Sequence, residues 1–143
     1  MKVYLGPYKE NRKEQIHIHD YDTWNMDDTL AMIILPMLKQ LKATKHGVPY
    51  MDYEDMPEHL QYISRQYDPR AVGDLFNNWN DFDHEFDHQV KVWDWMMDEM
   101  IWAMDQIANE DRVSLDVWYT KEHSKRLDNG LRLFGKYYRS LWD

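Results

Sequence analysis

The segment WDWMMDEMIWAM, residues 93–104, strongly constrains the fold of this chain. It belongs to a helix predicted over Phe86–Asn109, because apolar residues recur there at helical spacing. The main stripe of this helix contains Val90, Trp93, Met97, Met100, Ile101, Met104 and Ile107, and Trp95, Met96 and Trp102 widen it. A helix that is apolar around so much of its circumference lies at the centre of a fold or in a subunit interface.

Two further helices are predicted to pack with it. The first covers about Asn25–Lys45, with Pro36 inside it as an expected kink. Its apolar face is predicted to contain Leu30, Ile33, Ile34, Met37, Leu38 and Leu41. The last helix covers about Lys121–Leu141, and its predicted inward side chains are Leu127, Leu131, Phe134, Tyr138 and Leu141.

Shorter elements are expected between and before these helices. Lys2–Leu5 and Gln15–His19 resemble two strands of a terminal hairpin, since Ile16 and Ile18 alternate with two histidines as in a half-buried strand. A two-stranded hairpin needs a helix to cover one face. The remaining predictions are short helices over Pro57–Ser64 and Arg70–Asn78 and an extended piece around Val113–Trp118.

The fold class that follows is mainly α (α+β): a bundle of two long helices and a C-terminal helix, with a small N-terminal β-hairpin. At 143 residues the chain has the size of one ordinary domain. We expect a single domain over 1–143, with a β element at 1–20 and a helical core at 21–143.

The net charge of −9 argues against binding to nucleic acid or to an anionic membrane, because both require a cationic surface. The absence of cysteine excludes disulfides and thiolate metal sites. The longest apolar run, Leu30–Leu35, is too short to span a bilayer, and the first fifteen residues lack the apolar core of a signal peptide. A reducing cytoplasm is the expected location.

Acidic and basic residues are segregated along the chain. Asp74–Asp111 contains eleven acidic residues and one basic residue, Lys91, whereas Tyr119–Asp143 is mainly basic. Two interpretations stay open at this point. Acidic and basic helices can pack side by side, or the basic residues can line a positive concavity on an otherwise acidic protein.

The second interpretation predicts a site for a small anion or nucleotide. Its candidate ligand-binding residues are Trp24, Lys42, Lys45, His46, Arg126, Arg132, Lys136 and Tyr137. Guanidinium groups can bind phosphate oxygens in a fork while aromatic rings stack on a base. Gly130 and Gly135 suggest the close approach of a neighbouring backbone or ligand, because glycine disfavours a helix interior. The alternative is a helix–helix contact in which basic side chains cover aromatic core edges.

Catalytic and metal-binding chemistry have weaker support. His17 and His19 share one side of a strand, and His84 and His88 are four residues apart in an acidic segment. Two imidazoles and a carboxylate suit zinc or iron, but the pattern is not HExxH and acidic helices often carry histidines on a solvated face. The chain has no nucleophile elbow or phosphate loop, so we expect neither an enzyme nor a cofactor.

Three long motifs resemble a family of small proteins from tailed, T4-like bacteriophages. They are YDTWNMDDTLAMIILPMLKQLKATKHGVP near the N-terminus, WDWMMDEMIWAM in the middle and NGLRLFGKYYRSLWD at the C-terminus. The resemblance implies a protein made in the host bacterial cytoplasm during infection. It implies no particular activity.

The leading hypothesis is therefore a non-enzymatic phage accessory protein that binds a small anionic ligand. Such a protein could sequester a nucleotide immune signal, for example an ADP-ribose derivative or a cyclic nucleotide. A first alternative is a morphogenesis or host-protein-binding protein, and a second is a metal-dependent hydrolase. The apolar middle helix also predicts a homo-oligomer, because one chain was expected to cover only one of its stripes.

Overall fold

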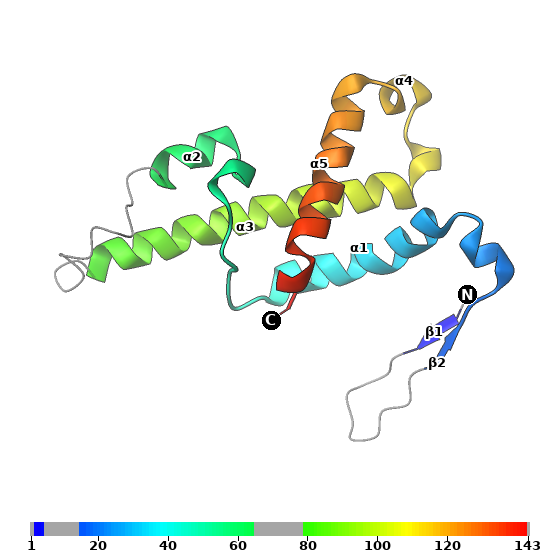
Figure 1. Ribbon diagram of the computed structural model, residues 1–143, viewed down its shortest axis with the longest axis horizontal. Coiled ribbons are helices and arrows are strands. Elements are labelled where there is room, and N and C mark those ends of the chain that lie inside the picture. Colours follow the sequence, from blue (N-terminus) through cyan, green and yellow to red (C-terminus); the bar gives the residue numbers. More distant parts are fainter. Residues whose placement is uncertain (1, 5–14, 65–78, 143) are drawn as a thin grey trace.

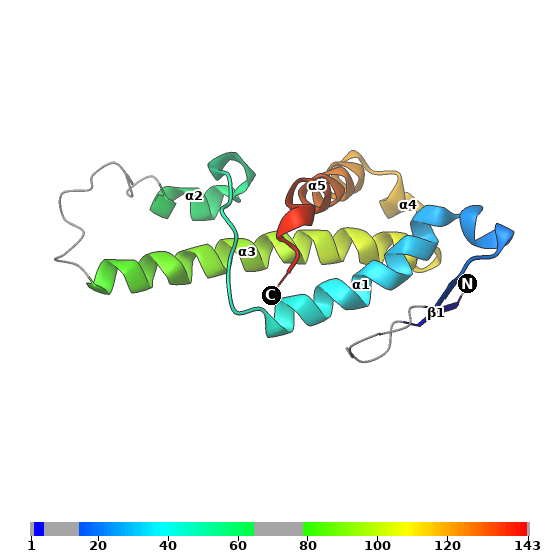
Figure 2. The ribbon, with the colours of Figure 1, turned by 60° about the horizontal axis from the view of Figure 1, so that its bottom comes forward.

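A computed structural model describes residues 2–4, 15–64 and 79–142 of the chain. Helix α3 (Trp79–Ala108) runs along the length of the molecule, α1 (Met26–Thr44) lies beside it, and α5 (Lys121–Tyr137) crosses it (Figures 1 and 2). Both α1 and α5 pack on α3. The mainly helical fold with three principal helices is confirmed. The middle helix begins at Trp79 rather than at Phe86.

The core is built around α3. Val92, Met96, Met97 and Met100 have no exposed surface, and Trp93 and Met104 are also buried. Side chains of α1 and α5 pack against this cluster, including Leu38 and Leu133. The described chain therefore buries more than one side of α3 by itself. The sequence placed this helix either at the centre of the fold or in a subunit interface, and the fold favours the centre.

Helix α1 faces α3 with a different set of residues from the one predicted. Ala31 and Leu38 are buried, and Ile34, Leu35 and Leu41 pack against the core. Leu30 and Met37, which were expected on the same inner face, are exposed. The apolar residues of α1 span a broad arc, and the sequence alone did not show which part of this arc meets α3. The helix continues through Pro36, which is exposed.

Gly130 sets the orientation of α5 on α3. A Cβ atom at this position would lie 2.5 Å from the Glu99 carbonyl oxygen and 2.6 Å from the Ala103 Cβ atom, so the two helix backbones meet here. The predicted close approach at Gly130 is confirmed. At Gly135 the expected close backbone approach is wrong for the described residues, because none of them lies within 4 Å of an added Cβ atom.

This contact rotates the inward face of α5 relative to the prediction. His123, Leu133 and Tyr137 are buried, whereas Leu131 and Tyr138 are exposed. Because Gly130 has to face α3, the side chain that follows it, at position 131, is directed away. Helix α5 ends at Tyr137, and a 3-10 turn, Tyr138–Ser140, follows it.

The connections contain short helical pieces. Helix α2 (Glu58–Ser64) follows Pro57 as predicted, and a 3-10 turn, Tyr53–Asp55, precedes it. The extended piece predicted around Val113–Trp118 is wrong, since α4 (Leu115–Trp118) is helical after an N-cap at Ser114. The helix predicted over residues 70–78 lies outside the described residues. No helix in the described ranges is long and apolar enough to cross a membrane.

Strand β1 (Lys2–Tyr4) pairs antiparallel with β2 (Gln15–His17), with Val3 opposite Ile16. The two strands lie beyond the start of α1, away from the long axis of α3 (Figures 1 and 2). Ile16 and Ile18 are 60% and 49% exposed, so the expectation of a half-buried strand is wrong. Residues 5–14, which would form the turn of a hairpin, lie outside the described residues, so the hairpin itself stays a prediction.

Candidate functional site

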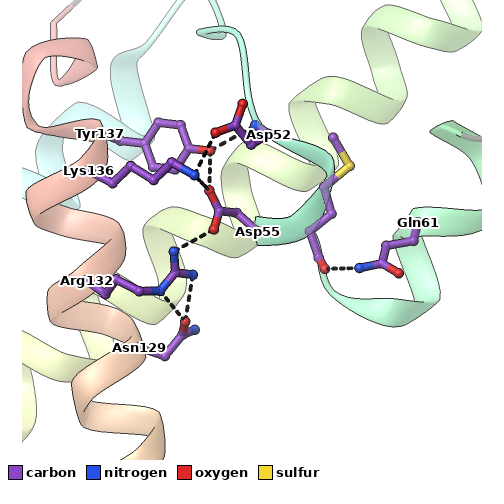
Figure 3. A network of polar contacts seen from close by, with 8 residues as sticks. Asp52, Asp55, Gln61, Asn129, Arg132, Lys136 and Tyr137 are labelled. Atoms are coloured by element: carbon purple, nitrogen blue, oxygen red, sulfur yellow. Dashed lines mark hydrogen bonds and ion pairs between the residues drawn. The ribbon is translucent and has the colours of Figure 1, made fainter.

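The basic residues of the last helix converge on one buried carboxylate, Asp55. Asp55 lies at the end of the 3-10 turn before α2, and its side chain is only 4% exposed. The guanidinium of Arg132 donates to it at 2.6 Å and the hydroxyl of Tyr137 donates at 2.8 Å. The ammonium of Lys136 contacts the same carboxylate (Figure 3). Three side chains from two successive turns of α5 therefore hold one acidic side chain of the α1–α2 connection.

The cluster has a second carboxylate at its edge. Lys136 also pairs with Asp52 at 2.6 Å, and the backbone N–H of Asp52 donates to the Tyr137 hydroxyl at 3.0 Å. Asn129 accepts hydrogen bonds from Arg132 through its side-chain oxygen. Two cations thus meet two carboxylates, so the cluster is close to neutral.

These contacts perturb the acidity of the groups involved. Burial alone would raise the pKa of Asp55, but hydrogen bonds from Lys136, Tyr137 and Arg132 outweigh it and lower the pKa below its ordinary value. Hydrogen bonds to Asp52 and Asp55 raise the pKa of Lys136. Burial, with the bond to Asp55, raises the pKa of Tyr137 to about 12. At neutral pH the carboxylate and the ammonium are therefore charged, and Tyr137 keeps the proton that it donates.

The other predicted cations also have carboxylate partners, all of them on α3. Lys42 pairs with Asp98 and Lys45 pairs with Asp94, each at 2.5 Å. Arg126 donates to both oxygens of Glu99, whose side chain is 10% exposed, and its guanidinium lies 4.1 Å from the centre of the Trp102 ring. Acidic α3 thus lies between the basic end of α1 and basic α5, as the side-by-side interpretation of the charge pattern predicted.

The structure does not bring the eight predicted ligand-binding residues onto one point. Arg132, Lys136 and Tyr137 meet at Asp55, whereas Lys42 and Lys45 meet α3. Trp24 precedes α1, whose first residue, Met26, lies roughly 24 Å along the helix axis from Lys42 at 1.5 Å per residue. His46 is exposed just beyond the opposite end of α1. The single pocket that would join the two basic sets has no support in these contacts.

The histidine candidates for a metal site have other surroundings. The rings of His17 and His19 stack edge to face at 4.4 Å on the exposed β2 segment. His88 is buried, and its Nε2 atom lies 2.9 Å from the Leu60 carbonyl oxygen. His84 lies on α3 in a turn whose side chains are outside the described part. Among the side chains that are described, no group of three or more His, Asp or Glu residues is arranged to hold a metal ion.

A second candidate site is the solvent-facing side of α1, which includes Leu30, Ile33 and Met37 from the predicted inner face. Met26, Leu30, Ile33 and Met37 follow one another at intervals of four, three and four residues, so they form one ridge. Met26, Leu30 and Met37 are 56%, 43% and 60% exposed, Ile33 is half-buried, and Met32 beside the ridge is 53% exposed. We call Met26, Leu30, Met32, Ile33 and Met37 the outer surface of α1.

This outer surface carries no charge. The charged residues of α1 are Asp27, Asp28, Lys39 and Lys42. At 100° per residue they all fall on the side facing α3 or on one flank, which leaves an uncharged arc of roughly 160° from Met32 to Leu30. The uncharged residues between the apolar ones are Pro36, Gln40, Ala43 and Thr44, which are exposed, and Thr29, which is half-buried. Tyr21 and Trp24, each 83% exposed, precede the surface at its N-terminal end.

Comparison of the chain with protein-family models, with curated proteins and with solved structures finds no match. The resemblance to tailed-phage proteins stays a prediction.

Proposed function

We propose that this protein is a non-enzymatic interaction protein that binds another protein chain through the outer surface of α1. The observation that carries the proposal is the uncharged, methionine-rich arc of a helix whose opposite side already packs in the core. Surface helices of soluble proteins normally place charged residues on the solvent side, and contiguous exposed apolar surface marks interaction sites. Methionine is frequent at such sites because its flexible side chain adapts to a partner.

The proposal belongs to the morphogenesis or host-binding class among the functions considered above. The internal pairing of the basic residues supports this class over the anion-binding class. A protein that acts by binding needs no catalytic group, in agreement with the lack of a catalytic motif. The resemblance to phage proteins would make it an accessory protein of infection, acting in the host cytoplasm.

A photo-crosslinking amino acid, introduced into the full chain at position 32 or at position 37 in bacterial cells, tests the proposal. From each of these two positions we expect a covalent adduct with one defined protein chain, identified by mass spectrometry. Position 131, an exposed leucine on α5, is the matched control and should give no such adduct. Equal labelling from all three positions, or none from 32 and 37, would contradict the proposal.

A small anionic ligand is the second candidate function, and one observation favours it. Arg132, Lys136 and Tyr137 already converge on a single carboxylate, which is the arrangement that a phosphate group would use. An ADP-ribose derivative or a cyclic nucleotide would have to displace Asp55. A thermal-shift titration with ADP-ribose, cyclic AMP and inorganic phosphate tests this function.

Under this second function, the ligand should stabilise the wild type, and the Arg132→Ala and Lys136→Ala variants should lose the effect. Asp55→Asn should bind the ligand more tightly, because the competing carboxylate is gone. The ligand should also be released chemically intact on denaturation. If no anion shifts the melting temperature of either the wild type or Asp55→Asn, the anion-binding function is refuted.

A further inference from the structure

We infer that His17 and His19 form a surface site for one divalent metal ion with square-planar or tetragonal coordination, of which Cu²⁺ is the strongest binder. The inference is independent of the binding function proposed above, because it involves neither the outer surface of α1 nor the carboxylate of Asp55. Neutral imidazole is the commonest metal ligand in proteins, and Cu²⁺ binds nitrogen ligands more tightly than the other first-row divalent ions do.

The backbone brings the two imidazoles to the same side of an extended segment. His17 is the last residue of β2, and His19 continues the extended conformation with φ −97° and ψ 156°. Side chains two residues apart in an extended chain lie on the same side, and Ile18 between them lies on the other. Both histidines are exposed, so an ion can reach them directly from solvent.

The spacing of the two rings distinguishes between coordination geometries. Their centres are 4.4 Å apart. With a metal–nitrogen bond of about 2.0–2.1 Å, a ligating imidazole has its ring centre about 3.2 Å from the ion. Two rings that meet the ion at a right angle therefore have centres about 4.5 Å apart, whereas a tetrahedral angle separates the centres by about 5.2 Å. The observed spacing fits the right angle, which Cu²⁺ and Ni²⁺ prefer and structural Zn²⁺ does not.

Only a rotation of the rings is needed for both imidazoles to bind one ion. The two ring planes are 89° apart, so the edge of one ring faces the other ring. Rotation about the bond between Cβ and the ring is broad for histidine, so each ring can turn a nitrogen towards a shared ion with little movement of its centre. Water molecules complete the coordination of an ion at an exposed site, and no third side chain is required.

The charges around the two histidines favour a cation. Residues 15–38 contain four aspartates and no lysine or arginine. Asp20 follows His19 directly, and Asp22 accepts a hydrogen bond from the His19 backbone N–H at 2.8 Å, which stabilises the turn that begins there. Lys2 is opposite His17 in the register of the two strands and adds one positive charge. The segment around the site is therefore negative in sum, and this charge attracts a divalent ion.

Isothermal titration calorimetry of the untagged full chain with Cu²⁺ tests the site. We expect one tightly bound ion per chain, and His17→Ala and His19→Ala should each weaken binding by about tenfold or more, because one of the two imidazole ligands is gone. His59→Ala removes an exposed histidine of α2 and is the matched control, which should leave the affinity unchanged. A wild type that binds no Cu²⁺, or wild-type affinity in both His17→Ala and His19→Ala, would overturn the site.

An exchange of two neighbouring residues separates this site from a general attraction of Cu²⁺ to an acidic chain. The double variant His19→Asp, Asp20→His keeps the composition and the net charge but moves the second imidazole by one position, away from the side of His17. This variant should bind Cu²⁺ as weakly as His17→Ala does, with an unchanged circular dichroism spectrum. Wild-type affinity in the double variant would show that the two-residue spacing is irrelevant and would refute the inference.

Electron paramagnetic resonance of the Cu²⁺ complex tests the coordination itself. We expect the axial spectrum of a tetragonal site, with coupling to two imidazole nitrogens in the wild type and to a single one in His19→Ala. A wild-type spectrum without imidazole coupling would mean that carboxylates and water hold the ion, and the inference would then be wrong.

Discussion

Helices α1 and α3 are both apolar around more than one side, but they differ in what covers them. Helix α3 lies between α1 and α5, and its methionines Met96, Met97 and Met100 are fully buried. Helix α1 packs on α3 with one side only, and its methionines Met26, Met32 and Met37 are more than half exposed. The same residue type therefore forms the core of the chain in one helix and an open surface in the other.

This difference shows that a broad apolar arc does not by itself indicate where a helix lies. The apolar arc of α3 is covered by α1 and α5 of the same chain. For α1 the outer part of the arc has no such neighbour among the described elements, and its lack of charge distinguishes it from an ordinary solvated face. The paired charges follow the same division, since three acidic residues of α3, Asp94, Asp98 and Glu99, pair with Lys45, Lys42 and Arg126 of the neighbouring segments.

Substituting matched methionines gives the largest expected contrast between the two helices. Met100→Ala should lower the free energy of unfolding by about 3 kcal/mol, because it removes a fully buried side chain and leaves a cavity. Met37→Ala should change it by no more than about 0.5 kcal/mol in the monomer. Urea unfolding at low protein concentration measures both. Similar losses for the two variants would mean that the outer surface of α1 is covered within the chain.

The helix crossing at Gly130 allows a second matched test. Gly130→Ala should destabilise the protein by about 2 kcal/mol, since its Cβ atom would overlap the Glu99 backbone and the Ala103 side chain. Gly135→Ala should instead stabilise it by up to about 1 kcal/mol, because the new methyl group meets no neighbour and alanine favours the helix. Thermal unfolding of the two variants compares them directly. A neutral Gly130→Ala would show that α5 packs on α3 less closely than described.

The buried carboxylate of Asp55 is expected to contribute a similar amount. Asp55→Asn should cost about 2 kcal/mol, less than for most buried ion pairs, because Arg132 and Lys136 are 49% and 38% exposed and can be rehydrated. Asp52→Asn, whose side chain is 49% exposed, is the control and should cost less than about 1 kcal/mol. Chemical unfolding at neutral pH measures both variants.

The stability difference between the wild type and Asp55→Asn is expected to depend on pH. Because the pKa of Asp55 is lower in the folded than in the unfolded protein, its ionised form stabilises the fold fully above about pH 4. That contribution decreases as the pH falls through the folded-state pKa. The difference in stability between wild type and Asp55→Asn should therefore shrink on acidification. A difference that stays constant down to pH 2 would be inconsistent with an ionised Asp55 in the fold.

The smallest effect is expected for the exposed ion pair at the junction of α1 and α3. Lys42→Ala should lower the free energy of unfolding by no more than about 0.5 kcal/mol, since Asp98 is largely exposed and water screens the pair. Lys39→Ala, which removes an exposed lysine from the same helix, should have no measurable effect on the monomer. Unfolding at low and high salt would show whether the Lys42 contribution is electrostatic, since salt should abolish it.

The sequence located the first and last of the three helices well because helical periodicity and the residues at helix ends act over a few positions, whereas the middle helix begins seven residues before its predicted start. Asn25 is at the N-cap of α1 and Thr120 caps α5 by accepting from the His123 N–H, and both helices begin within one or two residues of the predicted start. The rotation of each helix was harder to predict. Leu30, Met37, Leu131 and Tyr138 were placed inside and are exposed, because apolar residues at neighbouring angles have similar local preferences.

The candidate sites were also predictable only in part. The sequence showed that Arg132 and Lys136 share a face of the last helix, and both reach one carboxylate. It did not show that this carboxylate is Asp55, which lies 77 residues before Arg132 in the chain. Asp55 is one of many acidic residues, and only its position in the turn before α2 distinguishes it. The outer surface of α1 was missed because three of its five residues, Leu30, Ile33 and Met37, were predicted to face the core.

The sequence by itself determined that this chain forms a mainly helical, acidic protein with an apolar middle helix, because composition and periodicity depend on local chemistry. Only the tertiary structure decided which apolar residues are covered and which charges are neutralised. Both depend on contacts between segments far apart in the chain, such as Gly130 with Glu99 and Lys45 with Asp94. The middle helix was thereby placed in the core, and α1 was left as the helix with a surface available to a partner.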